Sequence, residues 1–108
     1  MNFQEAAARF EQSGAGSDDF KLLYKNAVEL MSSDVENAAL YFVIGVAAHS
    51  YVTKYEDQGV TAEFADHAKA VLVGFNRKIS QALVADAKAR LALLSEVANE
   101  YQLRVNQF

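Results

Sequence analysis

Residues 38–48 read AALYFVIGVAA, the longest apolar run of the chain. The run is too short to be a membrane span, which needs ~20 apolar residues. It belongs to a helix that we expect from Asp34 to about Asp57, and the first half of this helix is apolar on every side. A helix of that kind must be covered all round, so the pattern predicts the central helix of an all-α fold.

The rest of the chain also favours helices, because alanine is abundant and proline is absent. Apolar spacing predicts a short helix over residues 1–12, and the Ser- and Gly-rich stretch 13–17 reads as a flexible linker, so this helix is expected to attach loosely. A second helix follows from Ser17 to about Met31. Together with the helix from Asp34 and a last segment, these elements predict one domain, residues 1–108, folded as an antiparallel bundle of four helices.

The last segment, residues 61–108, carries two apolar stripes that do not join. The first ends at Phe75, and the second has the spacing of a coiled-coil seam. The second stripe consists of Val84, Ala87, Leu91, Leu94, Ala98, Tyr101, Val105 and Phe108. As one helix the segment would span ~72 Å at ~1.5 Å per residue, whereas a compact chain of this size is roughly 35 Å across. The segment therefore either kinks near residues 74–80 or projects, with its stripe covered by another chain.

Composition and charge exclude several classes of function. The chain has no cysteine, which excludes disulfides and thiolate chemistry. Its formal net charge of −4 argues against nucleic-acid or anionic-membrane binding. The first residues resemble no signal peptide, so we expect a cytoplasmic protein. No phosphate-binding loop, HExxH motif or nucleophile elbow occurs, and the sequence predicts no enzyme and no cofactor.

Two histidines offer the one alternative chemistry. His49 and His67 are expected at similar heights on either side of the turn near Gly59, and Glu63 lies four residues before His67. Two imidazoles and a carboxylate could hold a metal ion or a small ligand. Both histidines lie on apolar stripes, however, so packed core residues are the favoured interpretation.

The C-terminal stripe and a row of tyrosines predict a surface that binds protein. Tyrosine has an apolar ring and a polar tip and is enriched at interfaces. We expect the interface to comprise Tyr51, Tyr55, Leu91, Leu94, Tyr101, Val105 and Phe108. The expected function is a helical protein–protein interaction module of adaptor, inhibitor or chaperone type. We expect it to act by helix packing, to form a homodimer and to bind another protein as well.

Overall fold

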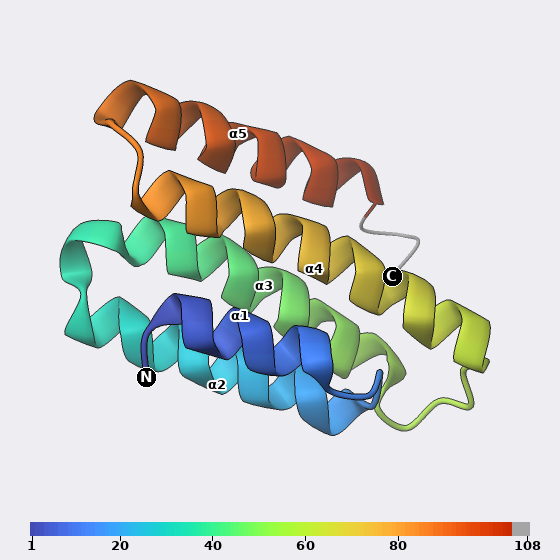
Figure 1. Cartoon of the computed structure of the whole chain (residues 1–108). Helices are drawn as coiled ribbons and strands as arrows, with labels where there is room; N and C mark the ends of the chain where they lie inside the picture. Colours follow the sequence, from blue (N-terminus) through green and yellow to red (C-terminus); the bar gives the residue numbers. More distant parts are fainter. Residues whose placement is uncertain (105–108) are drawn as a thin grey trace.

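The computed structural model describes residues 1–104, and within that range the chain is all-helical without strands (Figure 1). The elements are α1 (Phe3–Gln12), α2 (Ser17–Ser33), a single 3-10 turn η1 (Val35–Asn37), α3 (Ala38–Tyr55), α4 (Ala62–Leu83) and α5 (Ala87–Arg104). The Cα radius of gyration is 13.1 Å. The all-α prediction is thus confirmed at the level of fold class, and the last segment forms two helices where one long helix was expected. In the described part of the chain, no helix has the length and apolar character needed to cross a lipid bilayer.

Helix α1 is docked on the rest of the structure. Asn2 caps it, because the Asn2 side chain accepts from the Glu5 backbone N–H at 2.8 Å while the Glu5 carboxylate accepts from the Asn2 backbone N–H. Phe3 and Phe10 are buried, and the Phe10 ring meets the Phe20 ring edge-on with centroids 5.1 Å apart. Helix α1 is therefore docked in this structure, and its loose attachment stays a prediction. The linker is also shorter than expected, since α2 already begins at Ser17.

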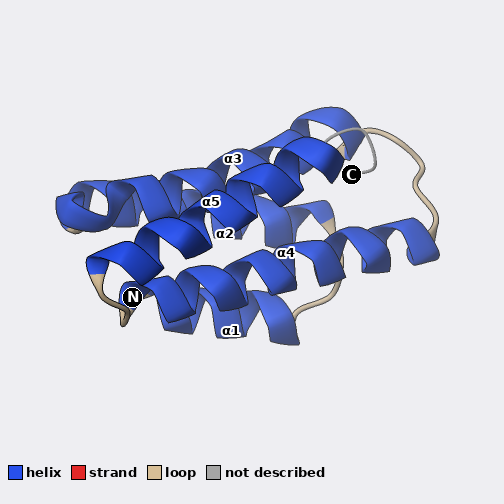
Figure 2. Cartoon of the chain, turned by 90° about the horizontal axis from the view of Figure 1, so that it is seen from above, coloured by secondary structure: helices blue, strands red, loops and turns tan. Residues whose placement is uncertain are grey.

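Helices α2 and α3 form the tightest pair in the fold. A Cβ at Gly45 would make ordinary van der Waals contact with the Ala27 Cβ, at 3.6 Å, and with the Tyr24 ring, at 3.7 Å. The two helices therefore pack directly against each other at this point. On the far side of α3 lie the other helices, α4 and α5 (Figure 2).

The position of α3 corrects one expectation. The apolar pattern predicted a central helix covered on every side, but α3 runs along one edge of the molecule in Figure 2, with no helix outside it. Phe42 is 56% exposed, and Ala39 and His49 are exposed as well. The side of α3 that carries these three residues has no cover within the described chain.

The break in the last segment also lies elsewhere than expected. Helix α4 continues through residues 74–80, and the chain turns at residues 84–86. Asp86 is the reason, because its carboxylate accepts from the Ala89 backbone N–H at 2.9 Å and begins α5. The mismatch between the two apolar stripes therefore marks a loop between separate helices. Gly74 is simply an exposed residue inside α4.

Helix α5 folds back over α4 and also contacts α3 (Figure 1). Its one fully buried residue in the described range is Val97, while Leu93, Leu94 and Tyr101 pack against the core more loosely. Leu91 and Leu103 are largely exposed. The chain thus shelters one side of α5 and leaves other apolar side chains of the same helix open.

Replacing Gly74 with alanine distinguishes a continuous helix from a kinked one. Nothing lies within 4 Å of a Cβ at Gly74, so we expect Gly74→Ala to raise the free energy of unfolding by about 0.5–1 kcal/mol, the usual penalty of glycine inside a helix. Gly74→Pro should lower it by about 3 kcal/mol or more. Urea unfolding followed by circular dichroism measures both changes. A destabilising alanine would show that the helix needs glycine at this point.

Candidate functional site

A cleft of about 350 Å³ lies between α2 and α3 on the uncovered side. Its lining is apolar and aromatic: Tyr24, Val28 and Met31 come from α2, and Phe42, Gly45, Val46 and His49 come from α3. The imidazole of His49 stacks on the Tyr24 ring, with centroids 4.5 Å apart and planes 26° from parallel. This stack forms one end of the cleft, and Phe42 stands at its rim.

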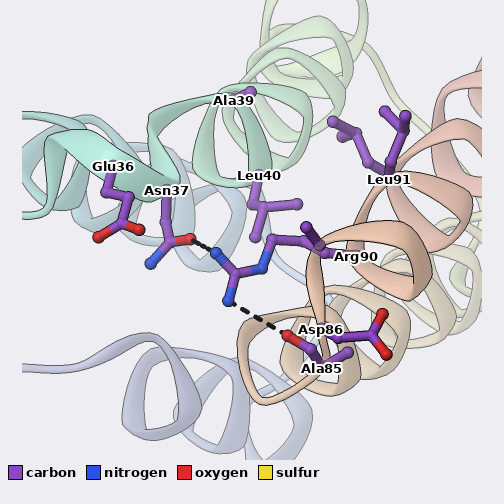
Figure 3. Close-up of a pocket in the computed structure, with 10 residues that line it drawn as sticks. Glu36, Asn37, Ala39, Leu40, Ala85, Asp86, Arg90 and Leu91 are labelled. Atoms are coloured by element: carbon purple, nitrogen blue, oxygen red, sulfur yellow. Dashed lines mark hydrogen bonds between the residues drawn. The ribbon is translucent and has the colours of Figure 1, made fainter.

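A second cleft, of about 460 Å³, lies between the start of α3 and the start of α5 (Figure 3). Ala39 and Leu40 of α3 and Leu91 and Leu94 of α5 form its apolar part. Its polar edge is built by Glu36, Asn37, Asp86 and Arg90. The exposed side of α3 therefore lies as a ridge between two grooves.

Arg90 holds the second cleft in shape. Its guanidinium donates from Nε to the Ala82 carbonyl at 3.1 Å and from Nη2 to the Ala85 carbonyl at 3.3 Å. It also donates from Nη1 to Asn37 Oδ1 at 2.7 Å (Figure 3). Carbonyls at the end of a helix lack partners in their own helix and attract a cation. Arg90 thus completes the end of α4 and ties the α4–α5 turn to the start of α3.

Asn37 and Tyr41 extend this network to Asp34. Asp34 Oδ2 accepts from the Tyr41 hydroxyl at 2.6 Å and from the Asn37 amide at 3.0 Å. These two hydrogen bonds, with a smaller contribution from the Arg90 charge, hold the pKa of Asp34 below its usual value. Burial, followed by the bond to Asp34, raises the pKa of Tyr41 to about 12. One chain of polar contacts therefore joins the α2–α3 connection to the α4–α5 turn.

The two clefts and the ridge between them form one continuous surface, which we call the α3 face. It comprises Tyr24, Val28 and Met31 of α2, Ala39, Phe42, Val46 and His49 of α3, and Leu91 and Leu94 of α5. None of these nine residues is acidic or carries a lysine or arginine side chain. Contiguous apolar surface of this kind is typical of sites that bind another protein.

The structure divides six of the seven predicted interface residues into three groups. Leu91 and Leu94 lie on the α3 face, as lining of the second cleft. Tyr55 and Tyr101 are half-buried and pack against the core instead. Val105 and Phe108 lie outside the described residues. Two of the seven predicted residues therefore belong to the surface defined above.

Tyr51 is a core residue, which corrects its assignment to an interface. Its ring is 2% exposed and stacks on Phe20, with centroids 4.0 Å apart and planes 18° from parallel. Tyr55 and Phe64 complete the cluster, at centroid distances of 5.2 and 6.4 Å from Tyr51. Burial is the main reason that the pKa of Tyr51 is raised. The row of tyrosines thus closes the end of the core between α2, α3 and α4.

The two histidines lie outside the core, contrary to the favoured interpretation, and they do not form a metal centre. Both His49 and His67 are exposed, as is Glu63. No group of three side chains from His, Cys, Asp or Glu within residues 1–104 is arranged to hold a metal ion. His49 contributes to the α2/α3 cleft, through its stack on Tyr24. The described residues therefore provide no cluster of ligands for the metal-binding alternative.

Sequence reasoning missed Phe42, Val28 and Val46 as surface residues. A signal was present, because no charged residue occurs between Ala38 and Thr53, so any open side of this helix has to be apolar. Helix α2 carries a similar signal, with Tyr24, Val28 and Met31 spaced by four and three residues beside its buried stripe. These two adjacent apolar stripes make the apolar side of α2 wider than a helix with one covered face requires.

No protein-family model, curated protein or solved structure matches this chain. The interpretation of the α3 face therefore rests on its own geometry and chemistry.

The Asp34–Tyr41 hydrogen bond predicts how stability depends on pH. The pKa of Asp34 is lower in the folded protein, so its contribution is present at neutral pH and is lost as the pH falls through that lowered value. The pKa of Tyr41 is raised from 10.0 to about 12, so its contribution is present below pH 10 and is lost as the pH rises through about 12. We expect Tyr41→Phe to weaken both dependences.

The measurement is the free energy of unfolding as a function of pH for the wild type and for Tyr41→Phe, together with the ultraviolet absorbance of phenolate. Tyr24→Phe is the matched control, because Tyr24 lies on the surface cleft and has no bond to Asp34 among the described contacts. An acid limb that is unchanged in Tyr41→Phe would contradict the assignment.

Proposed function

We propose that the protein is a small helical interaction module, an antiparallel bundle that acts by helix packing, and that the α3 face binds a second copy of the chain. The single observation that carries this proposal is the exposed, charge-free ridge of α3, which lies between the apolar α2/α3 cleft and the apolar part of the α3/α5 cleft. Phe42 is the most exposed aromatic side chain among the described residues, and such a side chain in water favours a partner. The activity requires no catalysis and no cofactor.

The shape of the α3 face suits a copy of itself. A two-fold dimer brings the same patch of both chains together, so the patch has to offer both a projection and a recess. Phe42 is the projection, and the α2/α3 cleft of about 350 Å³ beside it is the recess. Each Phe42 can then insert into the cleft of the other chain.

The charge-free side chains of the face favour a copy of the chain as the partner. A charged protein surface would place charge against apolar side chains.

Phe42→Glu tests the surface. We expect the wild type to be a dimer by light scattering and Phe42→Glu to be a monomer with unchanged helix content, because Phe42 is already largely exposed in one chain. Loss of a central aromatic contact should weaken association by at least ~30-fold. Leu103→Glu is the matched control, since Leu103 is 82% exposed and lies off the α3 face. A wild type that stays monomeric throughout a concentration series would refute the proposal.

A further inference from the structure

Asn76 of α4 is an exception in the core. It is the only polar residue among residues 1–104 that is fully buried, with 2% exposure. Neither Nδ2 nor Oδ1 of its amide has a hydrogen-bond partner. An amide can form several hydrogen bonds, and a buried one that forms none destabilises the fold by about 1–3 kcal/mol. With α1 docked, the amide of Asn76 is therefore buried without a hydrogen bond.

The unused amide lies beside α1. Asn76 borders a cleft of about 350 Å³ between α1 and α4, which also includes Ser80 and Gln81 of α4. From α1 the cleft receives Gln4, Ala7, Ala8 and Glu11. Ala7 is the residue of these four that is packed against the core, and it presents only a methyl group. Helix α1 thus packs here through a methyl group, and the Asn76 amide forms no hydrogen bond with Gln4 or Glu11 of the same cleft.

Helix α1 is held mainly by apolar contacts. Its anchors are the buried side chains of Phe3, Ala6 and Phe10, and the Lys69 ammonium donates to the Ser13 carbonyl just after the helix. The ion pair of Glu11 with Arg77, at 3.2 Å, is formed by side chains that are mostly exposed, so it adds little. Residues 13–16 join α1 to α2, and a Cβ at Gly14 or Gly16 would meet only the Asp19 carboxylate within 4 Å. A ten-residue helix is also marginal in water once it is undocked.

We propose that the surface beneath α1, on α2 and α4, is a docking site for an amphipathic helix of another protein, which displaces α1. The ligand helix carries large apolar side chains at two positions seven residues apart, as Phe3 and Phe10 do. A carboxylate directly after the second anchor pairs with Arg77, as Glu11 does. The position of Ala7 holds a hydroxyl or an amide, which bonds Asn76. The ligand helix therefore has the same anchors as α1 and forms one hydrogen bond more, to Asn76.

This site does not depend on the α3 face. Helices α1 and α3 lie at opposite edges of the molecule in Figure 2, so a ligand helix in place of α1 leaves α3 uncovered. Failure of either proposal can thus be recognised while the other still holds.

The test uses the full chain and synthetic peptides of residues 1–14. We expect the peptide with Ala7→Ser to bind about tenfold more tightly than the wild-type peptide, the effect of one added hydrogen bond to a buried group. The Ala8→Ser peptide is the matched control, because Ala8 is exposed and the change has the same effect on helix propensity. Binding is measured by fluorescence anisotropy, and displacement of α1 by hydrogen exchange of its amides.

The reciprocal variant places the change on α4. In Asn76→Leu the Ala7→Ser peptide should lose its tenfold advantage, and Asn76→Ala gives the same readout if leucine does not fit the core. Equal binding of the Ala7→Ser and Ala8→Ser peptides, or binding that leaves the α1 amides protected, would overturn the proposal.

Discussion

A long stretch of α3 without charged side chains sets the main constraint on this fold. From Ala38 to Thr53 the chain carries no Asp, Glu, Lys or Arg, so contact of the apolar side chains of this stretch with water is unfavourable. Helix α2 covers one side and packs directly against it at Gly45 and Ala27. Helices α4 and α5 cover two more. The remaining side is the ridge of the α3 face, and the proposed dimer follows from its exposure.

The Arg90 network determines where the uncovered surface ends. Arg90 bonds the carbonyls at the end of α4 and the side chain of Asn37 at once, so it fixes α5 against the start of α3. Without that contact the α3/α5 cleft would have no defined shape. Asp34 and Tyr41 continue the network into the α2–α3 connection. A few polar groups at one end of the molecule thus position apolar surfaces that come from three helices.

Much of the local structure could be predicted from sequence, and the site only in part. Apolar spacing located the helices, and Leu91 and Leu94 were identified as surface residues. The break was placed at residues 74–80 because the two apolar stripes do not join there, whereas the Asp86 cap places the break at residues 84–86. Tyr51 was assigned to an interface because tyrosine suits one, although its ring is buried against Phe20. Each error arose where two local interpretations were equally consistent with the residues.

The sequence by itself determined that the chain is helical, that residues 38–53 are uniformly uncharged and that α5 carries more apolar surface than one contact can bury. The tertiary structure alone decided which apolar stripes are covered, that Phe42 remains in solvent and that Asn76 is sealed beneath α1 without a partner. The physical reason is that apolar spacing limits which sides of a helix can be buried. The side that is buried depends on helices that are distant in sequence, whose packing balances all of these contacts together.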